Sequence, residues 1–276
     1  MNTMLTFIFS SDINKIFNPK ENDVMSVDAD GLNRELQKNL VSAFLLRIDF
    51  LELKQDCVTA LCNKLAPQFK NLERRQATNL KVEVNSQGQS SLQQVNSYDV
   101  ILNSPQELLS LTLSSEGSYV LIEAGRYRSN SVYKGIISDI VDVCTNNFPD
   151  VLSKRIGLRY VNEFSCKGIK DIGKIFSKRT STVTRGISGQ DVTKISRAIA
   201  MEEHLVGDGR IRLQYGVPNK FYPSEIVSYD LLLDIDSFIE ASIEVNEWSN
   251  EISKLNHAAY AVFTECMNAK FIEGMK

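Results

Sequence analysis

The segment Lys154–Phe164 constrains the fold more than any other part of this sequence, because its apolar and polar residues alternate. Successive side chains of a β-strand point to opposite faces of the sheet, so strict alternation is typical of a half-buried strand. One face would carry Ile156, Leu158, Tyr160 and Phe164, and the other Arg155, Arg159 and Glu163. The chain must therefore supply neighbouring strands and an apolar layer to cover one face.

The rest of the chain is long and apolar enough to do this. It has 276 residues, of which 43% are apolar and 24% charged, and a chain of this size buries a core without disulfide or metal support. The formal net charge is −3, so no overall positive field attracts nucleic acid. Nucleic-acid binding is disfavoured by this balance, although local basic clusters occur.

The cysteine pattern and the N-terminus indicate a cytoplasmic protein. The five cysteines are odd in number and dispersed, which predicts reduced, buried thiols rather than a zinc site or a disulfide framework. Residues 1–9 are partly apolar but lack the basic start and the cleavage site of a signal peptide. No run approaches the roughly 20 apolar residues that span a bilayer, so we expect no membrane association.

Alternation and helical periodicity predict the other elements. Residues 10–30 read as a polar connection, and residues 70–96, rich in Asn, Gln and Ser, as a long loop or arm suited to a partner contact. A second loop is expected over Thr180–Gln190. Strands are expected at 1–9, 45–53, 98–103, 107–113, 119–124, 155–164, 196–204, 210–215 and 228–236, and helices at 56–69, 131–146, 169–176 and 247–275.

This order of elements predicts an α+β fold of two intertwined halves. Each half would be a twisted antiparallel sheet with helices packed on one face. The first half would span residues 40–165 and the second 166–276, preceded by a strand and polar connection in residues 1–39, all within one continuous globular unit. The layouts of the two halves are similar, which suggests a duplication.

The polar faces of the strands carry the candidate binding residues. If the strands join one sheet, these side chains would form a lattice of arginines and aspartates. One interpretation is cross-strand ion pairing, each pair contributing about 0.2–1 kcal/mol, and we favour it. The other is a recognition face, because the guanidinium fork fits carboxylates and phosphates. The candidates are Arg155, Arg159, Asn162, Arg210, Arg212, Asp234 and Asp236, with Arg47, Asp49 and Asp230 beside them.

Two further candidates depend on spacing alone. Asp234 and Asp236 point the same way on a strand, which suits a divalent cation with a third ligand, but arginines on neighbouring strands favour salt bridges. His257 lies nine residues after Trp248, about 180° around a helix from its apolar stripe. It would face solvent or form a polar seam against another element or a partner.

No motif of a known catalytic class is present. Neither of the two histidines sits in a nucleophile–base arrangement, and Gly207-Asp208-Gly209 precedes a strand, as a turn does, rather than a helix, as a phosphate loop does. His204 with Glu202, Glu203 and Asp208 reads as a charged hairpin end rather than a metal site. The sequence thus predicts no catalytic residues, no metal ligands and no cofactor.

The strand Arg155-Ile156-Gly157-Leu158-Arg159-Tyr160-Val161-Asn162 resembles the signature of a sporadically distributed bacterial family of uncharacterised proteins. The similarity spans roughly residues 40–275. This chain departs from the family pattern in its N-terminal segment and in residues 70–96. It also lacks the Trp expected just before the central helix. The other matching segments are Phe44–Phe50, Leu232–Asp236 and Leu255–His257 with Phe263. The resemblance implies an accessory role in mobile or defence-related gene neighbourhoods, and it implies no catalytic activity.

These observations predict a non-catalytic interaction protein, a sensor, adaptor or accessory subunit of a bacterial defence or toxin-related system. The expected partner is another protein encoded nearby, or a second copy of the chain. The alternative is a nucleotide- or metal-binding enzyme that uses the Arg/Asp-lined sheet face.

Overall fold

The structure is a computed structural model. The strand and polar connection expected in residues 1–39 lie outside the residues that it describes. The described residues are 41–84, 90–114, 118–125, 130–166, 168–184, 196–227 and 229–274. The helices are α2 (Gln55–Leu65), α3 (Asn130–Asn147), α4 (Ile172–Ile175), α5 (Trp248–Cys266) and α6 (Ala269–Glu273). The strands are β1 (Val41–Phe50), β2 (Asn71–Val84), β3 (Ser90–Ser104), β4 (Leu109–Ser114), β5 (Tyr119–Ala124), β6 (Leu152–Cys166), β7 (Ala198–Val206), β8 (Gly209–Val217), β9 (Tyr229–Ile239) and β10 (Ile243–Glu244).

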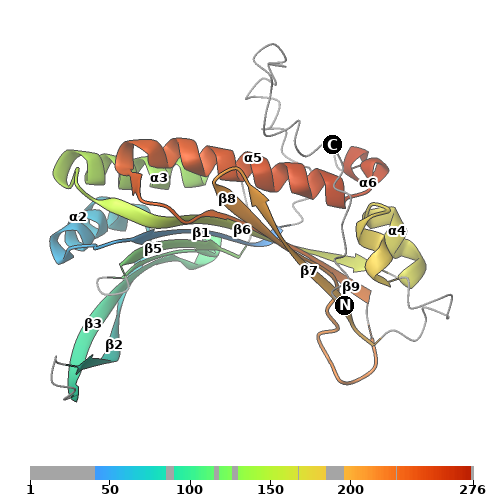
Figure 1. The fold of residues 1–276 in the computed structure, drawn as a ribbon, viewed down its shortest axis with the longest axis horizontal. Coiled ribbons are helices and arrows are strands. Elements are labelled where there is room, and N and C mark those ends of the chain that lie inside the picture. Colours follow the sequence, from blue (N-terminus) through green and yellow to red (C-terminus); the bar gives the residue numbers. More distant parts are fainter. Residues whose placement is uncertain are drawn as a thin grey trace, which may run out of the picture.

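All these strands form one antiparallel sheet with helices packed against it, which confirms the predicted α+β class. Nine strands run in the order β2-β3-β4-β5-β1-β6-β9-β8-β7, and the short β10 pairs with β6. Figure 1 shows α3 and α5 crossing one face of the sheet, while the β2–β3 hairpin and the β7–β9 end bend away from them. The opposite face is concave in this view, and no described helix covers it.

The core lies between the sheet and the helices and forms two apolar clusters. The larger cluster packs β1, β4, β5 and the first half of β6 against α2 and α3, with Leu46, Ile122 and Ile140 fully buried. The smaller packs the second half of β6, β8 and β9 against α4 and the C-terminal half of α5. Tyr160 touches both clusters, and its hydroxyl donates to Asn256 of α5 at 2.7 Å. This bond joins the strand Arg155–Asn162 to the segment Leu255–His257.

The prediction of two intertwined halves, each with its own sheet, is not supported. β6 pairs with β1 along one edge and with β9 along the other, so the strands assigned to the two halves belong to one sheet. The boundary at residues 165/166 falls at the end of this shared strand. Alternation within a segment shows that it is a strand, but it carries no information about which strand lies on each side.

The predicted loop at residues 70–96 is also wrong over its described part. Asn71–Val84 and Ser90–Ser104 pair along their whole length as the β2–β3 hairpin. Only Asp99–Ser104 of β3 also pair with β4, so the outer part of the hairpin is a two-stranded ribbon that extends beyond the sheet. Polar composition favoured a loop, whereas the ladder satisfies the backbone polar groups without needing apolar side chains.

Three other elements differ from their predictions. The last helix ends at Cys266 because Met267 is extended, with φ −97° and ψ 151°, and forms a bridge with Phe176. A short α6 follows in place of a continuous helix to residue 275. Residues 169–175 form a 3-10 turn and the single turn α4, and Thr180–Thr184 form a 3-10 helix rather than a loop.

Candidate functional site

The candidate site is the central and β7-side part of the uncovered sheet face, and the register explains why charged side chains gather there. Asp236 lies between Arg159 of β6 and Arg212 of β8, and Asp234 lies beside Gln214. These residues occupy the positions that alternate with the core residues of their strands. Six of the eight residues expected to bind a ligand or partner, Arg155, Arg159, Arg210, Arg212, Asp234 and Asp236, thus lie on this face.

Arg159 and Asp234 form the best-defined ion pair of this face. The Arg159 Nε and Nη2 atoms donate to the two oxygens of Asp234 at 2.9 and 2.7 Å, in the bidentate geometry that strengthens such pairs. The Asp234 side chain is 8% exposed and the Arg159 side chain 47%. The hydrogen bond and the charge of Asp234 raise the pKa of Arg159. A carboxylate held in this way is already neutralised, so the structure favours a salt bridge over a cation site.

Arg155 explains the glycine of the strand motif. Its guanidinium lies directly over Gly157, where a Cβ atom would be 2.9 Å from Nη1. In this position it stacks on the Phe238 ring at 4.8 Å from the centroid and approaches Asp49 at 3.8 Å and Asp236 at 3.7 Å. Arg155 therefore links β1, β6 and β9 across the uncovered face, and a side chain at position 157 would displace it.

Asp236 lies at a small hollow with incomplete partners. The hollow has a volume of about 200 Å³ and is lined by Arg159, Arg212, Gln214, Asp234 and Asp236. Its ion pair within the described part of the chain is with Arg155, at 3.7 Å, which is longer than a hydrogen bond. Burial raises the pKa of Asp236, and the nearby guanidinium groups of Arg155, Arg159 and Arg212 only partly offset this effect. Its ionised form is thus less favourable here than in water.

The β7 edge of the same face combines charge with exposed apolar side chains. Arg210 and Arg212 share Glu203, at 3.2 and 2.9 Å, and the hydrogen bonds from Arg212 and Arg210 keep the pKa of Glu203 below its ordinary value. Glu203 is flanked along β7 by Met201, which is 71% exposed, and Leu205, which is 78% exposed. Side chains of this kind that remain uncovered mark contact surfaces more often than polar ones.

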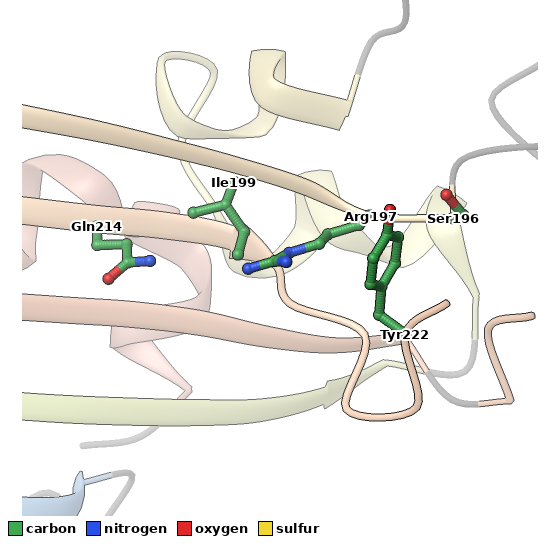
Figure 2. A pocket seen from close by; sticks show the side chains of 5 residues that line it. All are labelled: Ser196, Arg197, Ile199, Gln214 and Tyr222. Carbon is green, nitrogen blue, oxygen red and sulfur yellow. The ribbon is translucent and has the colours of Figure 1, made fainter. Parts of the chain in front are cut away.

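A second, wider hollow adjoins the first. Its volume is about 480 Å³, and it is shown in Figure 2 with its lining residues Ser196, Arg197, Ile199, Gln214 and Tyr222. Gln214 lines both hollows, so they follow one another across β8. The Arg197 guanidinium lies 5.5 Å from the centroid of the Tyr222 ring. Sequence reasoning missed this hollow because Tyr222 comes from the β8–β9 connection and Arg197 precedes β7, and no spacing links them.

Asn219 holds the wall of this hollow in place. Its side-chain amide donates to the carbonyl oxygens of Ser196 and Ser224, both at 2.8 Å, and its side-chain oxygen accepts from the Phe221 backbone at 3.1 Å. Asn219 has φ +47°, a conformation that Asn tolerates better than most residues. It ties the Tyr222 turn to the residue before Arg197, so the geometry of the hollow is built into the loop.

Two of the predicted binding residues lie away from the candidate site. Asn162 is 2% exposed and donates to the Leu233 carbonyl oxygen at 3.0 Å, so it reinforces the β6–β9 contact and does not reach the uncovered face. His257 is exposed on α5, where its Nδ1 lies 2.7 Å from the Ser253 carbonyl oxygen. Arg210 lies on the uncovered face, beside Arg212 and Glu203. Asn162 and His257 are thus apart from the candidate site.

The covered face carries a polar network that the sequence did not indicate. Glu202 accepts hydrogen bonds from the Tyr215 hydroxyl at 2.7 Å and from Arg179 at 2.6 Å, and His204 Nε2 lies 2.9 Å from it. Arg179 also pairs with Glu265 of α5 at 3.4 Å. The network ties β7 to β8 and to α5. His204 and Arg179 therefore belong to this network. The sequence also has small basic clusters at Arg126–Arg128 and at Lys178–Arg179 with Arg185, of which Arg126, Arg128 and Arg185 lie outside the described residues.

Glu202 makes stability dependent on pH. Partial burial raises its pKa, but the hydrogen bonds from Tyr215 and His204 and the charge of Arg179 outweigh this, so the pKa lies below the ordinary value of 4.5. A lowered carboxyl pKa stabilises the fold above the unfolded-state pKa, and this contribution is lost as pH falls through the folded-state pKa. We expect Glu202→Gln to show a smaller loss of unfolding free energy between pH 7 and acid than the wild type, measured by urea unfolding. Exposed Glu240 supplies the control Glu240→Gln, and an equal effect of both variants would contradict the prediction.

Comparison with protein-family models and with curated proteins finds no match for this chain. Within the described residues, no group of three or more His, Cys, Asp or Glu is placed to hold a metal ion. Among the helices of that same part, none combines the length and apolar character needed to cross a membrane. The function therefore has to be argued from the geometry of the uncovered face.

Proposed function

We propose that this protein is a non-catalytic interaction protein, an adaptor or accessory subunit that binds a protein partner through the β7–β9 end of its uncovered sheet face. The resemblance described above adds the expectation that the partner is encoded nearby, in a defence- or toxin-related system. The observation that carries the proposal is the concentration of exposed apolar and aromatic side chains at this end of the sheet.

Five large apolar side chains more than half exposed come from β7 and from the β8–β9 connection. They are Met201, Leu205, Phe221, Tyr222 and Val227, with exposures from 56% to 81%. Met, aromatic residues and Arg are the types enriched in protein interfaces relative to the rest of the surface. Arg210 and Arg212, on the neighbouring strand, are already oriented by their ion pairs with Glu203, so ordering them in a complex would cost little further entropy.

The ion pairing also argues for contact rather than chemistry. Asp234 is neutralised by Arg159, and Glu203 by two arginines. Carboxylates that are matched in this way are poor cation ligands, because binding a metal would require breaking charge-assisted hydrogen bonds. The charged lattice is better suited to fixing the orientation of a partner, which is what complementary charges at an interface do best.

Affinity purification of the tagged full-length protein from its native host, with neighbouring genes intact, tests the proposal. The wild type is expected to retain a stoichiometric protein, identified by mass spectrometry. Placing two carboxylates in the exposed apolar strip, with Met201→Glu and Leu205→Glu, is expected to abolish retention of that protein. The control is Leu51→Glu, a leucine that is 56% exposed at the end of β1.

Both variants must retain the wild-type melting temperature for the comparison to count. The proposal is wrong if the wild type retains no stoichiometric protein, or if the β7 variant retains it as well as the wild type does. A loss caused equally by the control would show that the effect is not specific to the β7–β9 end.

A further inference from the structure

We infer that the hollow around Arg197 binds a carboxylate side chain from an acidic segment of the partner protein. This inference rests on the proposed function, since it names the chemistry of the partner that docks on the same end of the sheet. It is carried by the charge of the hollow, by its shape and by the way it is held.

Arg197 differs from the other arginines of the uncovered face because no described acidic side chain pairs with it. Arg155, Arg159, Arg210 and Arg212 each have an acidic partner within 4 Å, whereas the described contact of Arg197 is with the Tyr222 ring. Stacking on an aromatic ring engages the face of a guanidinium group and leaves the N–H donors at its edge available. The hollow thus presents a cation with unused donors.

The rest of the lining would accept an anion. Ser196 contributes a hydroxyl group and Gln214 an amide group, and none of the described residues that line this hollow is acidic. The adjoining smaller hollow differs in this respect, because Asp234 and Asp236 line it. An anion placed at Arg197 would therefore meet hydrogen-bond donors without facing a like charge from the described lining of the hollow. Figure 2 shows Arg197 between Tyr222 and Gln214, with Ile199 beside it.

The amount of charge and the surroundings favour a carboxylate over a phosphate. One unpaired guanidinium matches the single charge of a carboxylate, whereas phosphate carries about −1.5 to −2 at neutral pH and is typically held by several donors and cations. Ile199 and Tyr222 contribute apolar atoms to the lining, and exposed Met201 and Phe221 are their near neighbours on β7 and in the β8–β9 connection. A peptide that carries Asp or Glu among apolar residues would place its carboxylate at Arg197 and its apolar side chains against the exposed apolar residues.

The inference also assigns a positioning role to Asn219. Its hydrogen bonds hold the Tyr222 turn against Ser196, so Arg197 and Tyr222 are arranged before any ligand arrives. Preorganisation of this kind lowers the entropy lost on binding. Asn219→Ala is thus expected to weaken carboxylate binding although Asn219 does not line the hollow itself.

Fluorescence polarisation with the full-length protein tests the inference. The probe is a fluorescein-labelled nonapeptide with Glu at three alternate positions among Ala and Leu, and the matched peptide carries Gln at those positions. We expect the Glu peptide to bind at least about tenfold more tightly than the Gln peptide, since a hydrogen bond to a charged group is worth roughly that factor or more. Arg197→Ala is expected to remove this difference.

A matched control and a competition separate the outcomes. Arg75→Ala removes an arginine that is 65% exposed on β2, at the opposite edge of the sheet, and should leave the binding of the Glu peptide unchanged. Equal losses in the two variants would overturn the inference, as would stronger competition by inorganic phosphate or by a single-stranded oligonucleotide than by unlabelled Glu peptide. If Arg197→Ala retains the native partner while the β7 variant loses it, the carboxylate inference is wrong and the proposed function stands.

Discussion

Gly216→Ala is expected to lower the unfolding free energy by about 2–5 kcal/mol, because backbone strain and steric overlap act together at this position. Gly216 has φ +139°, a conformation that side chains other than glycine rarely adopt. A Cβ atom there would lie 2.1 Å from the Ala198 carbonyl oxygen and 3.1 Å from the Ile199 Cα atom. These are backbone atoms of the paired strand β7, so no side-chain rotation relieves the overlap.

The displacement of β7 caused by Gly216→Ala should also alter the candidate site. Gly216 pairs with Ile199, which lines the larger hollow next to Arg197. Moving the start of β7 away from β8 would separate Arg197 from Gln214. The variant is therefore expected to lose carboxylate binding as well as stability.

Urea unfolding followed by the fluorescence of Trp248, the single tryptophan and a fully buried residue, measures the effect. The matched control is Gly207→Ala in the β7–β8 turn, where φ is +55° but no atom lies within 4 Å of the added Cβ. The control retains only the cost of the left-handed conformation, about 1–2 kcal/mol. If Gly216→Ala costs no more than Gly207→Ala, the steric argument is wrong.

The second large effect concerns the Arg159–Asp234 pair. Removing one partner of a buried ion pair costs about 3–5 kcal/mol, whereas an exposed pair contributes about 0.2–1 kcal/mol. Asp234 is buried and Arg159 is half exposed, so water screens this pair only in part. We expect a coupling free energy of about 1–3 kcal/mol from the cycle of Arg159→Ala, Asp234→Ala and the double variant.

The Lys254–Glu251 pair on α5 is the control cycle, because its N–O distance of 2.6 Å is similar but its lysine is 63% exposed. Its coupling should stay below about 0.5 kcal/mol. A coupling for Arg159–Asp234 no larger than this control, combined with loss of partner binding in Arg159→Ala, would assign the pair to recognition. A large coupling with partner binding retained would assign it to the fold.

Much of this architecture was predictable from local patterns. Alternation over Lys154–Phe164 placed Arg155 and Arg159 on the face opposite Ile156 and Leu158, and the register confirms that arrangement. The Gly207-Asp208-Gly209 turn joins β7 to β8 as predicted. These features depend on the spacing of apolar and polar residues over a few positions, which can be read directly from the sequence.

The predictions that failed required information that local patterns do not contain. Asn162 falls in the same alternation as Ile156 and Leu158, which already places it on the core side of the strand, but only the structure shows that its amide donates to the Leu233 carbonyl oxygen of β9. The β2–β3 hairpin has the polar composition typical of a loop, and only its pairing along the whole length identifies it as a pair of strands.

The sequence by itself determined that the chain forms a sheet with one apolar and one charged face, since side-chain alternation and helical periodicity are local properties of the covalent chain. Only the tertiary structure decided that the strands join in one sheet and that Arg197 meets Tyr222 and Gln214 in a hollow. The physical reason is that strand pairing and loop packing depend on contacts between residues far apart in the chain. Their free energies come from burial and hydrogen bonds that exist only once the whole sheet has formed.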